Sequence, residues 1–87
     1  MYFFYVLQSS RDGELYFGYT DNLKKRLGQH NSGEVASTKP RKPLVLIYYE
    51  AYYSKINAIQ REHSIKLRGN AYLQLKRRIK NCVAEAK

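Results

Sequence analysis

Five side chains in this sequence are of types that can act together on a phosphate ester. Such chemistry needs a group that accepts a proton from water, a cation that neutralises charge on the phosphate, and help for the leaving oxygen. The candidates are two phenols, a guanidinium, an imidazole and a carboxylate: Tyr5, Tyr16, Arg26, His30 and Glu62. Each also has an ordinary structural interpretation, so these residues can act together only if the fold brings them to one place.

Arg26 and His30 are four residues apart in the segment 22–31, so a helix there would place them on one face. The planar guanidinium of Arg26 matches the geometry of a phosphate, and the imidazole of His30 can carry a proton near neutral pH. The structural alternatives are an ordinary surface arginine and a histidine that favours the negative end of the helix dipole.

A free phenol has a pKa of about 10 and is a poor base at neutral pH, so Tyr5 and Tyr16 would need a neighbouring cation. The residues do not distinguish between the two as proton acceptor, and both can equally be residues at the edge of a core. Glu62 could hold a hard divalent cation such as Mg²⁺ if water and substrate oxygens complete the shell. Its structural alternative is an exposed helical glutamate paired with Lys66.

Three aromatic and β-branched segments predict the strands that must position these groups: 2–8, 15–19 and 44–50. Asp12-Gly13 predicts a tight turn, and therefore a hairpin between the first two strands. The first and third segments are apolar on both faces, which predicts that both are buried on both faces.

Helices are predicted for segments 22–31, 54–67 and 71–81. Thr20 or Asp21 can cap the first helix, and Gly33 can end it.

In the second helix, an apolar stripe is expected to face the core, with His63 in a structural role: Ile56, Ile59, His63 and Leu67. The third helix is expected to bury Tyr72, Leu75 and Ile79, and the segment 82–87 is expected to fray. The order ββαβαα predicts an α/β (α+β) fold, a three-stranded, mostly antiparallel sheet flanked by helices.

The 87 residues suffice for one domain, 1–87, and a hydrophobic content of 44% favours a folded chain. Sixteen Lys and Arg against seven Asp and Glu give a net charge of +9, which favours a polyanionic partner. Nucleic acid is the first candidate and an acidic membrane surface the second. The residues selected as nucleic-acid contacts are Lys39, Arg41, Lys42 and Lys66. The first three lie in a loop with two prolines, where they can equally be a solvated connector.

Cys82 is the single cysteine, so an internal disulfide and a cysteine-based metal site are excluded. A free thiol fits a reducing compartment, which predicts a cytoplasmic location. The apolar run 1–7 is too short for a signal peptide, and no run reaches the length needed to span a membrane.

Short pieces of the sequence, each weak alone, occur in a distinctive order. They are Phe3-Phe4-Tyr5, Tyr16-Phe17-Gly18, Gly18-Tyr19-Thr20, Asn22-Leu23, Arg26-Leu27, His30-Asn31-Ser32-Gly33, Ser37-Thr38-Lys39, Arg41, Pro43, Ala58, Arg61-Glu62 and Lys66. In this order and spacing the sequence resembles the GIY-YIG nuclease superfamily, and specifically its small stand-alone members. Those members are related to the N-terminal catalytic domain of the excinuclease C subunit of bacterial nucleotide-excision repair. The likeness runs from Tyr2 to about Lys66.

The resemblance implies endonucleolytic hydrolysis of phosphodiester bonds that depends on Mg²⁺ or Mn²⁺, with DNA as the leading substrate and a role in repair or recombination. It implies that Glu62 holds the metal, that Arg26 steadies the transition state and that Tyr5 or Tyr16 assists the water. His30 falls at a helix position that the family fills with histidine or tyrosine. The sequence departs from many relatives at Tyr19, where they have a lysine.

Two other functions stay open at this point. The chain can be a non-catalytic nucleic-acid-binding module, which its charge and tyrosine content alone would support. It can also be an accessory subunit that docks on a larger protein. Since no separate targeting segment is recognised, substrate selectivity would be intrinsic or supplied by a homodimer or a protein partner.

Overall fold

The computed structural model describes residues 1–86; Lys87 lies outside the described residues, with its part of the predicted tail. The elements in chain order are β1 (Tyr2–Ser9), β2 (Leu15–Thr20), α1 (Leu23–Asn31), the 3-10 turn η1 (Lys39–Arg41), β3 (Leu44–Tyr52), α2 (Lys55–Lys66), α3 (Asn70–Arg78) and α4 (Lys80–Glu85). This arrangement confirms the predicted α+β class, with helices flanking a three-stranded sheet.

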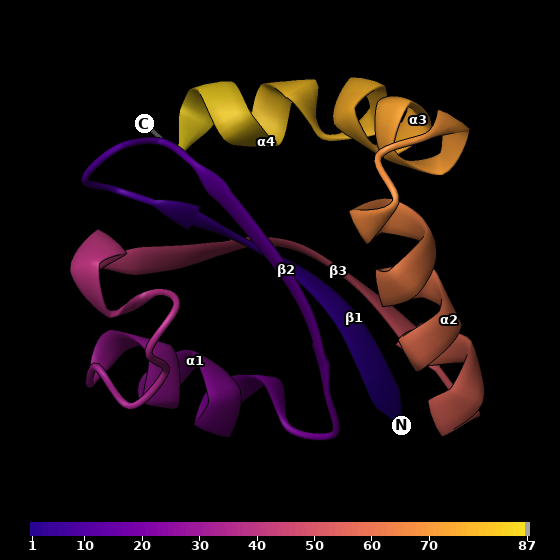
Figure 1. Cartoon of the computed structure of the whole chain (residues 1–87), viewed down its shortest axis with the longest axis horizontal. Helices are drawn as coiled ribbons and strands as arrows, with labels where there is room; N and C mark the ends of the chain where they lie inside the picture. Colours follow the sequence, from indigo (N-terminus) through magenta and orange to yellow (C-terminus); the bar gives the residue numbers. More distant parts are fainter. Residues whose placement is uncertain (87) are drawn as a thin grey trace.

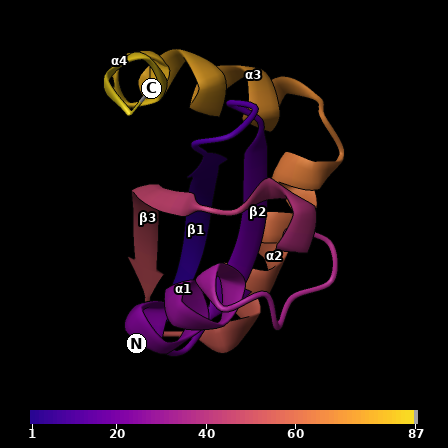
Figure 2. The ribbon, with the colours of Figure 1, turned by 90° about the vertical axis from the view of Figure 1, so that its left-hand side faces the viewer.

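The sheet has the order β2-β1-β3, with both pairings antiparallel, so β1 is the central strand. Figure 2 shows the three strands side by side. The predicted burial of the first strand on both faces is confirmed, because residues 4–9 are all buried. The same prediction for residues 44–50 was wrong: Val45 and Tyr49 are 40% and 52% exposed. The reason is that β3 is an edge strand, so part of each face lies beyond the helices.

Two hydrophobic clusters lie on opposite faces of the sheet, because alternate residues of a strand point to opposite sides. The cluster under α2 and α3 contains Phe4, Val6, Phe17, Ile65, Leu75 and Ile79. The cluster on the α1 side contains Tyr5, Leu7 and Leu44, with Leu23 and Leu27 packed against it. Figure 1 shows α1 and α2 on opposite sides of the strands, with α3 and α4 above them.

Helix α1 begins after Asn22, and not after Thr20 or Asp21 as predicted. The Asn22 side chain accepts a hydrogen bond of 3.0 Å from the Lys25 amide, which makes Asn22 the N-cap. Gly33 has a φ of +82° just beyond the helix, as predicted for a left-handed stop.

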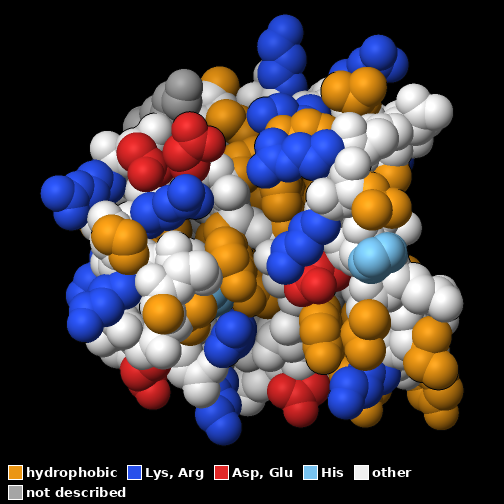
Figure 3. All heavy atoms as spheres, viewed as in Figure 1, with side chains coloured by type: hydrophobic (Ala, Val, Ile, Leu, Met, Phe, Trp, Pro, Cys, Tyr) orange, Lys and Arg blue, Asp and Glu red, His pale blue; other side chains and the backbone are white. Residues whose placement is uncertain are grey.

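Helix α2 turns a different face to the sheet than its apolar residues predict. Its fully buried residues are Ala58 and Ile65. Ile56 and Leu67 are 65% and 69% exposed. Ile59 and His63 are exposed too, so the predicted stripe is the outer face and His63 has no core role. Figure 3 shows an imidazole and hydrophobic side chains at the surface over α2.

The C-terminal region forms two short helices instead of one helix and a frayed end. Leu75 and Ile79 are buried as predicted, and Tyr72 is half-buried. Helix α4 stays helical because Cys82 and Val83 pack against the core. No helix within residues 1–86 is both long enough and apolar enough to cross a bilayer.

Candidate active site

An open cleft of about 530 Å³ lies between the start of α1, strand β2 and helix α2. Four of the five predicted chemical groups line it: Tyr5, Tyr16, Arg26 and Glu62. They come from β1, β2, α1 and α2 in turn. The fifth, His30, is completely buried behind Tyr5. The fold therefore gathers all five residues at one place.

Tyr5 reaches the cleft because its partner in the sheet has no side chain. Tyr5 lies opposite Gly18 in the β1–β2 register. A Cβ atom on Gly18 would lie 2.4 Å from the Tyr5 Oη and 2.6 Å from its Cζ. The phenol thus occupies the space that any other residue at position 18 would fill.

A chain of hydrogen bonds runs from the cleft into the protein. Arg26 Nε donates to the Tyr5 Oη over 3.3 Å. The Tyr5 Oη lies 2.9 Å from His30 Nε2, and His30 Nδ1 lies 2.7 Å from Thr38 Oγ1. Arg26 also donates to the Gln29 side chain over 3.1 Å, which holds the guanidinium along α1.

The surroundings of Tyr5 and His30 favour their neutral forms. Burial raises the pKa of the Tyr5 phenol, and the hydrogen bond and charge of Arg26 act against that rise. Burial, together with the positive charge of Arg26, lowers the pKa of His30 to about 4. At neutral pH the imidazole is therefore uncharged, and one of its nitrogens carries a lone pair that can accept a hydrogen bond.

Lys66 on α2 lies between Glu62 and the Tyr16 ring, beside the cleft. Its Nζ lies 5.8 Å from the centroid of the Tyr16 ring and 3.7 Å from the Glu62 Oε2. The pairing of Glu62 with Lys66, considered from the sequence as a structural alternative, therefore exists at the edge of the cleft. The Tyr16 ring in turn meets the His30 ring edge-on at a centroid distance of 4.9 Å. Helix α2 thus reaches the α1 side of the sheet around the edge of β2.

Comparison with known proteins identifies the family. The family model of the GIY-YIG catalytic domain matches residues 1–80. The chain belongs to the GIY-YIG family. This is a nuclease family, its substrate is nucleic acid, and its members generally use divalent metal ions.

Relatives extend this similarity over most of the chain. A UPF0213 protein of Bacillus pumilus is 47% identical over 66 residues, which make up 75% of this chain and 66% of the relative. A UPF0213 protein of Bacillus velezensis is 40% identical over 87 residues, covering 94% of this chain and 87% of the relative. The solution NMR structure of a UPF0213 protein from Bacillus halodurans matches with a TM-score of 0.54 and 29% identity, covering 92% of this chain and 86% of that one.

In this GIY-YIG domain, an ion pair sets the rotation of α2. Arg61 donates to both carboxylate oxygens of Glu50 on β3, over 2.9 and 3.1 Å. Burial would raise the pKa of Glu50, but hydrogen bonds from Arg61, Tyr52 and Tyr48 outweigh it and lower the pKa. Successive helical residues differ by about 100° in direction. With Arg61 turned to the sheet, the next residue, Glu62, faces the cleft.

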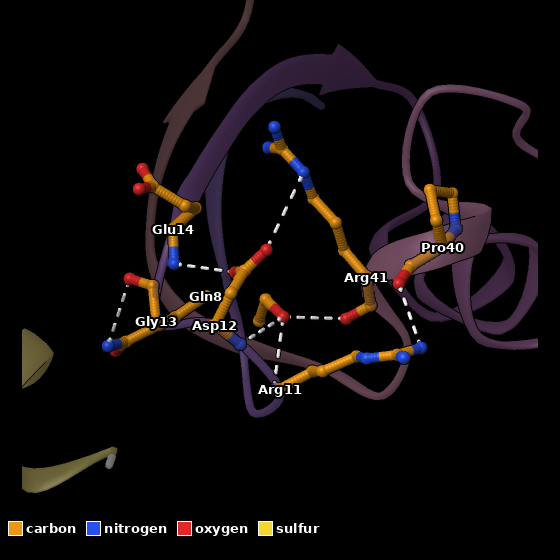
Figure 4. A network of polar contacts seen from close by, with 8 residues as sticks. Gln8, Arg11, Asp12, Gly13, Glu14, Pro40 and Arg41 are labelled. Atoms are coloured by element: carbon orange, nitrogen blue, oxygen red, sulfur yellow. Dashed lines mark hydrogen bonds and ion pairs between the residues drawn. The ribbon is translucent and has the colours of Figure 1, made fainter.

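The loop cations predicted to bind nucleic acid do not line the cleft, although Lys66 stands beside it. Lys39 and Lys42 lie near Gly33, at the C-terminal end of α1. Arg41 lies 3.9 Å from the Asp12 carboxylate in the β1–β2 turn (Figure 4). The cleft adjoins the other end of α1.

Two lysines that the sequence analysis did not select, Lys25 and Lys55, line the cleft. Lys25 precedes Arg26 in the first turns of α1, a position that could have suggested it. Lys55 opens α2, and nothing in the sequence places that end beside β2. Thr38 was noted only as part of a family match, without a role.

The donor atoms of the cleft suit a hard divalent ion. The carboxylates of Glu62 and Asp21 both line it. Within residues 1–86, no group of three or more His, Cys, Asp and Glu side chains could hold a metal by itself. An ion at Glu62 would therefore complete its shell with water and phosphate oxygens, which is how Mg²⁺ usually binds.

Proposed function

We propose that this protein is a metal-dependent endonuclease that hydrolyses phosphodiester bonds in nucleic acid, with DNA as its substrate. The observation that carries the proposal is that Tyr5, Tyr16, Arg26 and Glu62, from four different elements, line one cleft. A positively charged domain of +9 supplies the attraction for a polyanion.

In this proposal Arg26 binds the phosphate at the reacting position. Its guanidinium is half-buried, and its hydrogen bonds to Tyr5 and Gln29 fix its orientation. Lys25 and Lys55 supply further positive charge along the cleft wall. Glu62 holds a Mg²⁺ or Mn²⁺ ion, which when bound neutralises charge on the phosphate and the leaving oxygen.

Tyr5 is proposed as the group that accepts a proton from the attacking water. As the water proton moves to the Tyr5 oxygen, the phenolic proton moves to His30 Nε2, 2.9 Å away. The resulting hydroxide attacks phosphorus, the bond to the leaving oxygen breaks, and that oxygen takes up a proton from solvent. The extra proton on His30 then returns through Tyr5 to solvent in the cleft, which restores the starting state. The hydrogen bond from Arg26 Nε stabilises negative charge on the Tyr5 oxygen during this transfer.

Nicking of supercoiled plasmid DNA with Mg²⁺ or Mn²⁺ tests the proposal. We expect Glu62→Gln and Arg26→Ala each to lower the cleavage rate at least about 100-fold. The matched controls are Glu85→Gln on α4 and Arg77→Ala on α3, which change the same charges at exposed positions outside the cleft. They should cleave at nearly the wild-type rate.

No cleavage by the wild type would reject the nuclease proposal, and so would equal cleavage by the cleft variants and their controls. A wild type that binds DNA with a steep salt dependence but never cleaves it would instead establish a non-catalytic binding module.

We further propose a cytoplasmic enzyme that acts on branched or damaged DNA in repair or recombination, as the family resemblance suggests. Selectivity would then come from the cleft itself or from a protein partner or second copy. Cleavage of branched, nicked and linear duplexes, each compared with the matching RNA, tests the substrate. Equal rates on all of these substrates would reject the proposed preference for branched or damaged DNA.

Size-exclusion chromatography coupled to light scattering tests whether the protein forms a dimer.

A further inference from the structure

Thr38 holds the side of His30 that faces away from the cleft. Its Oγ1 lies 2.7 Å from His30 Nδ1, and both residues have no exposed surface. Thr38 is not among the residues that line the cleft, so it acts on the site only through the imidazole. The effect of Thr38 on the imidazole depends on which nitrogen of His30 carries the proton.

The donors and acceptors around Tyr5 indicate which nitrogen of His30 carries the proton. A guanidinium can only donate, so the Tyr5 oxygen accepts the hydrogen bond from Arg26 Nε. Among residues 1–86, the Tyr5 hydroxyl then has one acceptor for its own proton, the Nε2 of His30. Nε2 must therefore carry a lone pair. In a neutral imidazole, this places the ring proton on Nδ1.

Thr38 is arranged to receive that Nδ1–H. If its oxygen accepts from Nδ1, its hydroxyl proton can donate to the Val35 carbonyl oxygen, a longer contact of 3.4 Å. In the other tautomer, Nε2–H would point at the Tyr5 oxygen, and the Tyr5 hydroxyl proton would have no acceptor among residues 1–86 and would have to turn to water in the cleft. Among the side-chain and backbone partners within residues 1–86, the Nδ1–H tautomer is the one that satisfies these contacts together.

The loop that carries Thr38 is fixed at its far end. Ser9 Oγ, on the central strand, donates to the Arg41 carbonyl oxygen over 2.6 Å. Asn31 exchanges two hydrogen bonds with the backbone of Leu44, of 2.9 and 2.7 Å. The loop is thus attached to β1 and to the end of α1, so the hydroxyl of Thr38 has a defined place.

We propose that Thr38 is a positioning residue that fixes His30 as the Nδ1–H tautomer and so keeps Nε2 open for the Tyr5 proton. Its contribution to the reaction rests on the proposed function. The tautomer itself rests only on the hydrogen bonds, so it can be tested separately. A partner on the far nitrogen is a common means of setting which imidazole nitrogen reacts.

The tautomer can be measured by two-bond ¹H–¹⁵N correlation spectra, which show the nitrogen that bears the proton. The protein has two histidines, so His63→Gln at the exposed position leaves His30 as the single signal. In this background we expect Nδ1–H with Thr38 and with Thr38→Ser, and Nε2–H with Thr38→Val. An Nε2–H tautomer in the Thr38 protein, or an unchanged tautomer in Thr38→Val, would overturn the proposal.

Cleavage kinetics then test the role in the reaction. We expect Thr38→Val to lower kcat by about 10- to 100-fold with little change in KM, because the residue touches no substrate. Thr38→Ser should restore most of the rate, and Ser37→Ala, at the exposed neighbouring position, should leave it unchanged. Equal kcat for Thr38→Val and wild type, or equal loss in Thr38→Ser, would refute the role. An inactive wild type with the Nδ1–H tautomer would reject the nuclease function while retaining the tautomer assignment.

Discussion

Replacing Gly18 by alanine tests whether the position of the Tyr5 phenol controls the site. The added Cβ would lie 2.4 Å from the Tyr5 Oη, whereas non-bonded heavy atoms keep at least about 3.3 Å apart. The phenol must therefore move by about 1 Å. Such a shift would disrupt its hydrogen bonds of 2.9 Å to His30 and 3.3 Å to Arg26.

Two magnitudes follow from that displacement. Misplacement by about 1 Å can cost on the order of 100-fold in rate, so cleavage by Gly18→Ala should fall about 100-fold. Because Tyr5 is 2% exposed and packed among other side chains, overpacking should also cost about 1–3 kcal/mol of stability. Plasmid nicking and urea unfolding measure the two effects.

The control is Gly28→Ala on α1, where an added Cβ meets nothing within 4 Å. It should retain activity and gain about 0.5–1 kcal/mol, because alanine favours a helix over glycine. All three atoms nearest to the Gly18 position belong to Tyr5, so Gly18→Ala should cost less in a Tyr5→Leu background. Wild-type cleavage and stability in Gly18→Ala would refute this account of the site.

Three further outcomes can be measured. The pKa of His30 is about 4 in the folded protein and about 6.5 in an unfolded chain, so as pH falls the unfolded chain protonates this histidine first. The free energy of unfolding should therefore drop by about 2 kcal/mol from about pH 7 to about pH 5. The drop should persist in His63→Gln, and its absence in urea unfolding at the two pH values would contradict a buried neutral His30. Glu50→Gln should cost about 2–3 kcal/mol and displace α2, whereas Asp12→Asn in the exposed pair with Arg41 should change stability much less; equal losses would contradict the role of the ion pair. Alanine at Lys39, Arg41 and Lys42 together should weaken DNA binding and flatten its salt dependence without changing kcat, and an unchanged salt slope in a binding titration would remove these loop residues from the interface.

The strands and the first helix could be predicted because their signals are local. The aromatic run of β1, the Asp12-Gly13 turn and the left-handed Gly33 all act over a few residues. The face of α2 that packs on the sheet could not be predicted, because the polar residue Arg61 points inward and pairs with Glu50 on β3. Apolar periodicity does not detect such a contact, so it assigned the exposed face to the core.

The residue types of the candidate site could be predicted from the sequence, but the contacts between its side chains could not. Tyr5 and His30 are 25 residues apart in the chain, and only the packing of α1 on β1 shows that they share a hydrogen bond. A role for Thr38 could not be predicted, because its hydroxyl contacts a buried ring on another element. The distance of Lys39, Arg41 and Lys42 from the cleft could not be predicted, because charge density along the sequence does not say which end of α1 faces the cleft.

The central position of β1 has a consequence for how the chain is made. This strand leaves the ribosome before both of its neighbours: β2 follows after a short turn, and β3 only with residues 44–52. Until then one edge of an apolar strand has open backbone donors and acceptors, which is a template for pairing with another nascent chain. The interval ends when β3 docks, so the rate of translation through the loop before it sets how long newly made protein is exposed to aggregation.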